Sequence, residues 1–407
     1  MENFVARQAI FDKNLKVFAY ELLFRSGQEN VYTGTDADKA TSSVISDSFL
    51  TIGLESLTRG KKAFINFTKK LLMDETATIL PKDLLVVEIL EDVEPDIGII
   101  NACTKLKDAG YVLALDDFIF DAVYEPLIKL ANIIKVDFRL TGIEESKALI
   151  KKYGIQKINF LAEKVETQEE FDQALEIGFI YFQGYFFSKP VIVSSKEIPG
   201  YKFNYLNILH EINKKKVDFN KIEQVIKQDV SISFKLLKFI NSAFFSFTSN
   251  IQSIKQALVL LGINEFRKWV SLVVLKDMGE DKPDELMVMS IVRAKFCEIL
   301  ANEISLGDRC SELFFMGMFS VVDTFMGRPM EEILENFPLE DDIKGALLGH
   351  EGRFRNIFEL MLATEKAELD KIAEYSEKLN IDQSKLPGIY IQVLDSANQI
   401  FTSLPVK

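Results

Sequence analysis

Residues 111–117 read YVLALDD, and this short apolar run that ends in two carboxylates sets the pattern for the first half of the chain. Similar runs, rich in β-forming residues and separated by amphipathic stretches, recur up to about residue 190. Such alternation predicts a parallel sheet with helical connections, and about eight strands predict closure into a (β/α)8 barrel. The expected strands are Phe4–Ile10, Lys16–Leu23, Lys62–Asn66, Leu84–Glu88, Tyr111–Asp116, Asn132–Asp137, Lys157–Leu161 and Phe179–Gln183. The first of them also fits a flanking hairpin strand, which would make the barrel irregular.

Helical patterns lie between most of these runs. The clearest are Asp36–Ile52, Pro95–Ala109 and Thr167–Ile177. Thr167 is followed three residues later by Glu170, which predicts a capping box at the N-terminus of the third helix.

The pattern changes after Pro190, where the segment 191–200 contains serines, a proline and a glycine and indicates a linker. From residue 201 onward the apolar positions lie three and four residues apart, which predicts helices nearly throughout. Ile222, Val225 and Ile226 form one such apolar stripe, and Phe234, Leu237, Lys238 and Asn241 continue a second helix. We therefore expect an α/β barrel domain at residues 1–192, a linker at 193–200 and an all-α domain at 201–407.

Composition excludes several classes of protein. Hydrophobic residues make up 48% and charged residues 27% of the 407 residues, as in folded globular proteins, and this length suggests two domains and allows three. The net charge of −13 argues against direct nucleic-acid binding, because a phosphate backbone would be repelled. No apolar run reaches the roughly 20 residues of a bilayer span, and no export signal is evident. The three scattered cysteines fit a reducing compartment, so we expect a cytoplasmic protein.

Polar side chains gather at the ends of the predicted strands. They are Glu21, Asn66, Glu88, Asp116, Asp117, Lys135, Asp137, Glu163 and Gln183. In a βα barrel the carboxyl ends of the strands meet at one face, where active sites are built. Helix capping or exposure to water explains any single acid at a strand end, but a cluster of carboxylates costs stability unless cations neutralise it. The whole set therefore predicts a metal site.

The residue types narrow the metal and its chemistry. The two histidines, His210 and His350, lie in the other half of the chain, so the ligands are oxygens, which favours Mg²⁺ or Mn²⁺ over Zn²⁺. The tandem acids at 116 and 117 suit a two-metal arrangement acting on a phosphoryl group. Lys135 would balance anionic charge or hold the attacking water, and Arg25 is suited to bind a phosphate through two hydrogen bonds. Together, these residue types predict a site that binds or cleaves a phosphodiester.

Residues 1–190 resemble the EAL domain, the fold of cyclic di-GMP phosphodiesterases. Seven elements match in order, and together they are specific although each alone is weak: Glu21–Arg25, Asn66, Glu88–Glu91, Asp116–Phe118, Lys135–Asp137, Ala162–Glu166, and Gln183–Tyr185 with Lys189-Pro190. The resemblance implies a TIM-like EAL barrel. It also implies roles for single residues, with Glu21, Asn66, Glu88 and Asp116 on one metal ion, Asp116 and Asp117 shared with a second, Lys135, Glu163 and Glu21 in catalysis, and Arg25, Gln183 and Asp137 in ligand contact.

The sequence departs from the EAL pattern mainly in one loop. Where the family has Gly-Thr-Gly after Asp-Asp-Phe, this chain has Ile119-Phe120-Asp121, and side chains there disfavour any left-handed backbone that the loop needs. The glycine that follows the glutamate in the family is Lys164 here. We therefore expect a degenerate EAL domain that retains its ligands while the loop that organises them is altered.

The second half resembles the HDOD domain, an all-helical relative of the HD phosphohydrolases that lacks their metal ligands. The match is clearest over residues 228–237, 240–244, 254–257 and 260–262. The sequence contains no His-Asp pair, so a catalytic HD site is excluded by residue type.

Three functions are compatible with these features. In the first, a degenerate EAL domain binds Mg²⁺ or Mn²⁺ and cyclic di-GMP and relays the signal through the HDOD domain. In the second, the chain is an active Mg²⁺- or Mn²⁺-dependent cyclic di-GMP phosphodiesterase. In the third, it is a protein–protein interaction scaffold that binds no nucleotide. Expected partners are cyclic di-GMP, an unidentified protein at the HDOD domain and a second copy of the chain, but neither a membrane nor nucleic acid.

Overall fold

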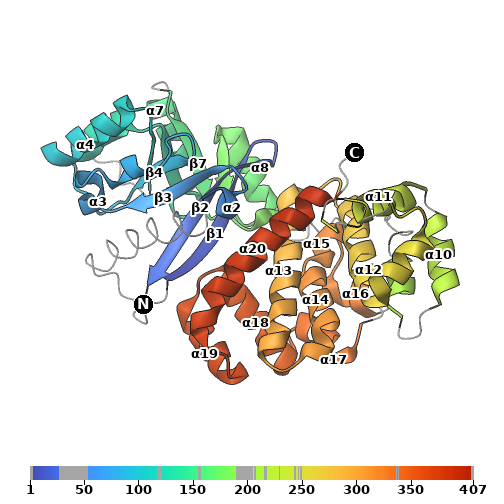
Figure 1. Ribbon diagram of the computed structural model, residues 1–407. Coiled ribbons are helices and arrows are strands. Elements are labelled where there is room, and N and C mark those ends of the chain that lie inside the picture. Colours follow the sequence, from blue (N-terminus) through green and yellow to red (C-terminus); the bar gives the residue numbers. More distant parts are fainter. Residues whose placement is uncertain are drawn as a thin grey trace. The chain divides into compact units, whose positions relative to one another are not determined.

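The computed structural model describes residues 3–26, 54–116, 122–154, 157–188, 205, 208–214, 218–228, 230–242, 244–245, 247, 250–335, 337 and 339–404. The chain divides into two compact units (Figure 1), one of Met1–Lys189 with Thr364–Asp370 and one of Pro190–Ala363 with Lys371–Lys407. The predicted helix Asp36–Ile52 and the predicted linker at 193–200 lie outside the described residues.

Eight strands close the first unit into a barrel in chain order, as predicted. They are β1 (Asn3–Asp12), β2 (Val17–Ser26), β3 (Lys62–Phe67), β4 (Leu85–Ile89), β5 (Val112–Leu115), β6 (Ile133–Asp137), β7 (Asn159–Glu163) and β8 (Tyr181–Gln183). β1 is antiparallel to both β2 and β8, whereas the other neighbouring strands are parallel. The first strand is therefore a hairpin strand inside the barrel wall, which confirms the alternative interpretation of the first run and makes the barrel irregular at this strand.

The hairpin follows from a short connection, because only antiparallel strands can be joined by a few residues. Asp12 holds the turn, since its Oδ1 accepts hydrogen bonds from the backbone N–H groups of Asn14 at 2.8 Å and Lys16 at 3.0 Å.

Helices connect the parallel strands of the barrel. They are α2 (Leu54–Thr58), α3 (Lys69–Met73), α4 (Ile97–Asp108), α5 (Glu125–Leu130), α6 (Phe138–Thr141), α7 (Ile143–Tyr153) and α8 (Gln168–Ile177), with short 3₁₀ turns η1 (Thr76–Ile79), η2 (Ala122–Tyr124) and η4 (Phe186–Ser188). The capping box predicted for α8 is confirmed: Glu170 N–H donates to Thr167 Oγ1, and the Glu170 carboxylate accepts from Thr167 N–H.

One apolar layer inside the barrel determines where the polar side chains go. It consists of Ile10, Ala19, Phe64, Val86, Ala114, Ile133 and Leu161, with Phe18, Val112 and Tyr181 packed against it. Side chains two positions apart on a strand share a face, so the residue two positions further along each parallel strand also faces inward. Two residues beyond these positions, the parallel strands carry Glu21, Asn66, Glu88, Asp116, Lys135, Glu163 and, after Tyr181, Gln183. The polar set is thus the next layer of the barrel interior.

The second unit is built from helices. They are α10 (Phe219–Lys227), α11 (Val230–Ile240), α12 (Ile254–Met278), α13 (Asp284–Glu303), α14 (Cys310–Phe319), α15 (Val322–Met326), α16 (Met330–Glu335), α17 (Asp341–Leu347), α18 (Arg353–Glu365), α19 (Leu369–Leu379) and α20 (Leu386–Ser403), with η5 (Gly307–Arg309) and η6 (Gln383–Lys385). Gly262 interrupts α12 with a positive φ of 74°.

The second predicted helix is confirmed as α11. Its buried face is formed by Ile232, Leu236 and Phe239, whereas Phe234 is 66% exposed. The stripe predicted for α10 is better placed, because Ile222 and Ile226 are both buried.

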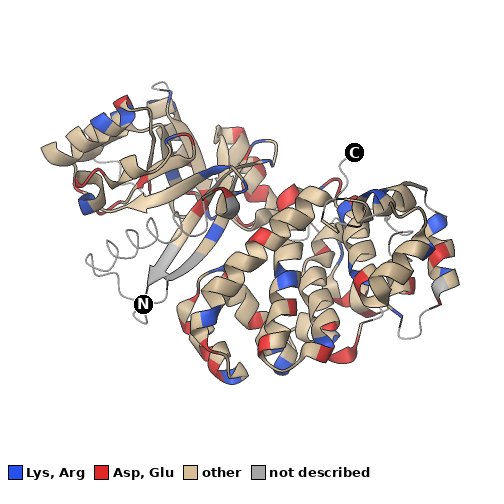
Figure 2. Ribbon diagram, in the orientation of Figure 1, with Lys and Arg blue, Asp and Glu red and all other residues tan. Residues whose placement is uncertain are grey.

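Figure 2 shows the lysines and arginines of the described residues scattered among acidic residues in both units. Over the same residues, no helix combines the length and the apolar character needed to cross a membrane.

Candidate metal and phosphodiester site

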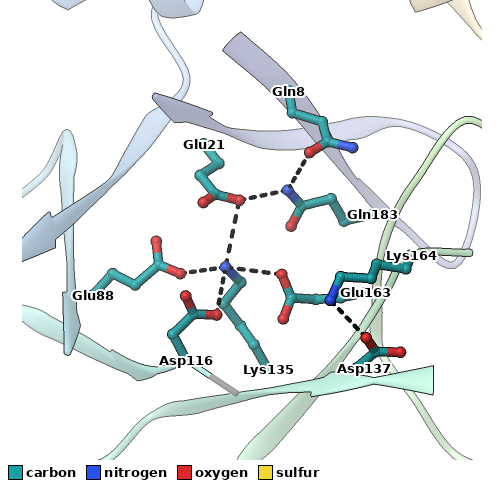
Figure 3. A network of polar contacts seen from close by, with 9 residues as sticks. All are labelled: Gln8, Glu21, Glu88, Asp116, Lys135, Asp137, Glu163, Lys164 and Gln183. Carbon is teal, nitrogen blue, oxygen red and sulfur yellow. Dashed lines mark hydrogen bonds and ion pairs between the residues drawn. The ribbon is translucent and has the colours of Figure 1, made fainter. Parts of the chain in front are cut away.

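Lys135 lies at the centre of the polar layer and is almost fully buried, at 1% exposure. Its Nζ lies 2.9 Å from Asp116 Oδ1, 3.0 Å from Glu163 Oε1 and 3.4 Å from Glu21 Oε2, and it also contacts Glu88 Oε1 (Figure 3). These side chains come from β2, β4, β6, β7 and the residue after β5, so the structure brings five of the predicted site residues into direct contact.

Gln183 extends this network on the β8 side. Its Nε2 donates to Glu21 Oε2 and, at 2.9 Å, to Gln8 Oε1. Sequence reasoning missed Gln8. On an antiparallel strand the mouth of the barrel lies toward the N-terminus, so the inward-facing residue is two positions before Ile10, and only the reversed direction of β1 could have identified it.

The charge balance of this cluster is strongly acidic, since four carboxylates contact one ammonium among the described residues. Burial, together with the charges of Asp116 and Glu21, raises the pKa of Glu163 to about 8 against the opposing effect of Lys135. Burial likewise raises the pKa of Glu88 well above its usual range.

The Lys135 ammonium has the opposite tendency. Burial lowers its pKa, but the surrounding carboxylates outweigh that effect, so the pKa lies well above its ordinary value. Lys135 is therefore charged at neutral pH, while the raised pKa values of Glu88 and Glu163 favour their protonated forms.

Several buried oxygens around the cluster lack hydrogen-bond partners, which bears on whether these residues suit a bound cation. Within the described part of the chain, Asn66 Oδ1, Glu88 Oε2, Glu163 Oε2 and Gln183 Oε1 have no hydrogen-bond partner. Asn66 lies beside Glu88 in the register of β3 and β4, so both belong to the same layer. Carboxylate and amide oxygens of this kind suit Mg²⁺ or Mn²⁺, and a bound cation would satisfy them.

The arrangement is not a preformed metal cage. No group of three or more described histidine, cysteine, aspartate or glutamate side chains is arranged to hold an ion as it stands. The described carboxylates surround the Lys135 ammonium instead. The donor types therefore fit a divalent ion, while the internal cation Lys135 lies among the same carboxylates.

Asp137 is not part of this contact network. Its Oδ1 accepts hydrogen bonds from the backbone N–H groups of Arg139 and Leu140, both at 3.0 Å, and thereby caps α6. Its Oδ2 accepts a hydrogen bond from Lys164 at 2.6 Å. Burial raises the pKa of Asp137, but these hydrogen bonds outweigh it and hold the pKa below its usual value. The ligand contact predicted for Asp137 stays a prediction.

Two predicted site residues fall outside what the structure describes. For Arg25 only the backbone is described, paired with Phe4 in the β1–β2 hairpin. Asp117 belongs to the segment 117–121, which lies outside the described residues together with the altered loop positions 119 and 121. Their roles stay predictions.

Comparisons with known proteins match two domain families to successive parts of the chain. The EAL domain matches residues 45–190 and the HDOD domain matches residues 198–331. The uncharacterized protein YuxH of Bacillus subtilis is 39% identical over 403 residues, covering 97% of this chain and 98% of that protein. The cyclic di-GMP phosphodiesterase CdgJ of Vibrio cholerae is 35% identical over 382 residues, covering 93% of this chain and 88% of that protein.

A solved structure gives a weaker likeness. Klebsiella pneumoniae BlrP1 in its calcium and cyclic di-GMP complex is 23% identical, covering 46% of this chain and 56% of that chain with a TM-score of 0.36. A likeness of this size supports no statement about function.

Proposed function

Since this chain belongs to the family of two-domain EAL–HDOD proteins, we propose that it acts in cyclic di-GMP signalling, with a barrel that binds divalent metal ions and cyclic di-GMP and relays the bound state through the helical unit. The observation that supports this function best is the buried Lys135 among four carboxylates at the mouth of a closed barrel, with further buried oxygens left without partners.

The metal ligands in this proposal are Glu21, Asn66, Glu88 and Asp116, with Asp117 as the further ligand of a second ion. Bound Mg²⁺ or Mn²⁺ would neutralise the acidic layer and so allow an anionic phosphodiester to approach it. The Lys135 ammonium adds a fixed positive charge. Gln183 would orient Glu21 through the hydrogen bond it donates, and Arg25 would contact a phosphate.

Hydrolysis of cyclic di-GMP is the second candidate function. Two observations favour it: the relative CdgJ, which aligns over nearly the whole chain, is named for this activity, and Lys135 and Glu163 are in contact at the mouth. In that reaction Lys135 Nζ would hold the attacking water, and Glu163 would accept a hydrogen bond from it. The altered loop after Asp116 is the reason to place binding before turnover.

One experiment separates these functions. Calorimetry of the full chain with cyclic di-GMP, with and without Mg²⁺ or Mn²⁺, measures binding, and chromatography of the same samples measures turnover. Metal-dependent binding without products supports the binding function. Repeated turnovers that disappear in Glu21→Ala support the phosphodiesterase. No binding at high-micromolar ligand with either metal would contradict both and leave an interaction scaffold.

The relay, a protein partner of the helical unit and pairing of two chains belong to the same proposal. Hydrogen exchange of α10 to α20 with and without cyclic di-GMP tests the relay, which requires a change in protection there. Light scattering of the full chain tests pairing.

A further inference from the structure

Lys164 directly follows Glu163 at the end of β7 and has a left-handed backbone, with φ at 56°. A residue with a Cβ disfavours this conformation, and the EAL pattern has a glycine at this position. Backbone of this kind persists where surrounding contacts compensate for it, and such contacts are present around Lys164.

The first contact joins two strand ends. Lys164 Nζ donates to Asp137 Oδ2 at 2.6 Å, and Asp137, only 6% exposed, is the register partner of Glu163 on β6 (Figure 3). In an extended strand the side chain after Glu163 would point to the outer face of the barrel. The left-handed turn instead brings the ammonium back to the inward-facing position of the neighbouring strand.

The second contact lies on the other side of the same turn. Val165 N–H donates to the carbonyl of Gln183 at 3.0 Å. At Gly184 an added Cβ would lie 1.8 Å from the carbonyl oxygen of Val165, so only glycine allows this approach of β8. The residues after Glu163 are therefore held by β8 on one side and, through Lys164, by β6 on the other.

A further set of ion pairs at these loops is more exposed. Arg139 pairs with Glu166 at 3.1 Å and with Glu170 at 3.0 Å, and its side chain is 43% exposed. Exposed pairs of this kind contribute little because water and salt screen them. The contact between Lys164 and the buried Asp137 is the one next to the acidic layer.

We propose that Lys164 is a positioning residue for the metal site: from its left-handed backbone it ties the end of β7 to the end of β6. It thereby fixes the Glu163 carboxylate, whose Oε2 is one of the buried oxygens that a bound cation would satisfy. It acts through Glu163 and Asp137. The inference rests on the proposed function, because it assumes that the mouth of the barrel binds a divalent ion. Metal affinity falls about tenfold when groups that orient ligands are removed, which sets the size of the expected effect.

The test compares three variants of the full chain by calorimetry with Mn²⁺ alone and by thermal unfolding in a chelator. Lys164→Gly removes the ammonium and relaxes the backbone, whereas Lys164→Arg keeps a cation. The matched control is Lys157→Gly, because exposed Lys157 also has a left-handed backbone, with φ at 62°, and precedes the opposite end of the same strand.

We expect Lys164→Gly to bind Mn²⁺ about tenfold more weakly than the wild type, with Lys164→Arg close to wild type and Lys157→Gly unchanged. The melting temperature of Lys164→Gly in chelator should not fall, because relief of the left-handed backbone offsets the lost ion pair. Wild-type Mn²⁺ affinity in Lys164→Gly, or an equal loss in Lys157→Gly, would overturn the positioning role alone. A wild-type chain that binds no Mn²⁺ would overturn the metal site as well.

Discussion

Each unit of the chain contains a buried lysine, and the two differ in their surroundings. Lys135 in the barrel is 1% exposed and Lys268 on α12 is 5% exposed. Lys268 contacts Glu265 at 2.7 Å and Glu298, whose second oxygen contacts Lys295. The described network around Lys268 therefore matches two ammonium groups with two carboxylates, whereas Lys135 faces four carboxylates.

This difference in charge balance shifts the pKa values of the buried acids in opposite directions in the two units. Burial raises the pKa of Glu298, but Lys295 and Lys268 outweigh it, and the pKa lies below its usual value. Burial of Glu88 is not offset in the same way, and its pKa lies well above the usual value. A balanced buried network is explained by packing and stability alone, but a surplus of buried carboxylates indicates a place for a cation.

Removing each lysine in turn should give the largest contrast. Lys135→Met removes the ammonium that four carboxylates share, and Lys268→Met takes one of the two ammonium groups from Glu298. Each change breaks a buried ion pair, which costs about 3 kcal/mol. Added Mn²⁺ should recover much of the loss in Lys135→Met, because the ion replaces the missing positive charge, and none of it in Lys268→Met. Urea unfolding of the full chain in chelator and in Mn²⁺ measures both effects. Equal recovery of the two variants would mean that the barrel cluster has no special affinity for cations.

Replacing one glutamate by glutamine in each unit should lower Mn²⁺ affinity in the barrel and stability in the helical unit. In Glu88→Gln the surplus of negative charge falls, so the metal-free stability should stay within about 1 kcal/mol of the wild type while Mn²⁺ affinity falls at least about tenfold. In Glu298→Gln a balanced network loses a charge, which should cost about 1–3 kcal/mol and leave Mn²⁺ affinity unchanged. Calorimetry and urea unfolding provide the two readings. A strongly destabilised Glu88→Gln chain that keeps its Mn²⁺ affinity would reverse the assignment of the two clusters.

Much of this contrast follows from the sequence, for identifiable reasons. Residues two apart on a strand share a face, so short apolar runs followed by acids predicted both the barrel and its polar layer. Gln8 was missed because β1 runs in the opposite direction, and direction is not encoded in the alternation of one strand. The helix α11 was predicted, but its buried face was not, because Phe234 is apolar yet exposed and helical periodicity alone does not decide which of two apolar faces is buried. The contacts of Lys135 with four carboxylates depend on distances across the barrel, which spacing along the chain does not give.

The pH dependence of stability should show the smallest contrast, with opposite signs for the two units. Burial first, then Asp116 and Glu21, hold the pKa of Glu163 at about 8, above its ordinary value of 4.5. The stabilisation that this group contributes is complete below pH 4.5 and is lost as pH rises through 8, so the metal-free barrel should lose stability between pH 6 and pH 8.5. Glu298 has a lowered pKa, so its contribution is present above its ordinary pKa and lost only in acid. Urea unfolding in chelator at several pH values measures the free energy of unfolding as a function of pH. Between pH 6 and pH 8.5 this free energy should change less with pH in Glu163→Gln than in the wild type, and as much as in the wild type in Glu298→Gln. If Glu163→Gln keeps the wild-type slope, a different group carries the alkaline loss of stability, and the surplus of acid at Lys135 is smaller than the contacts indicate.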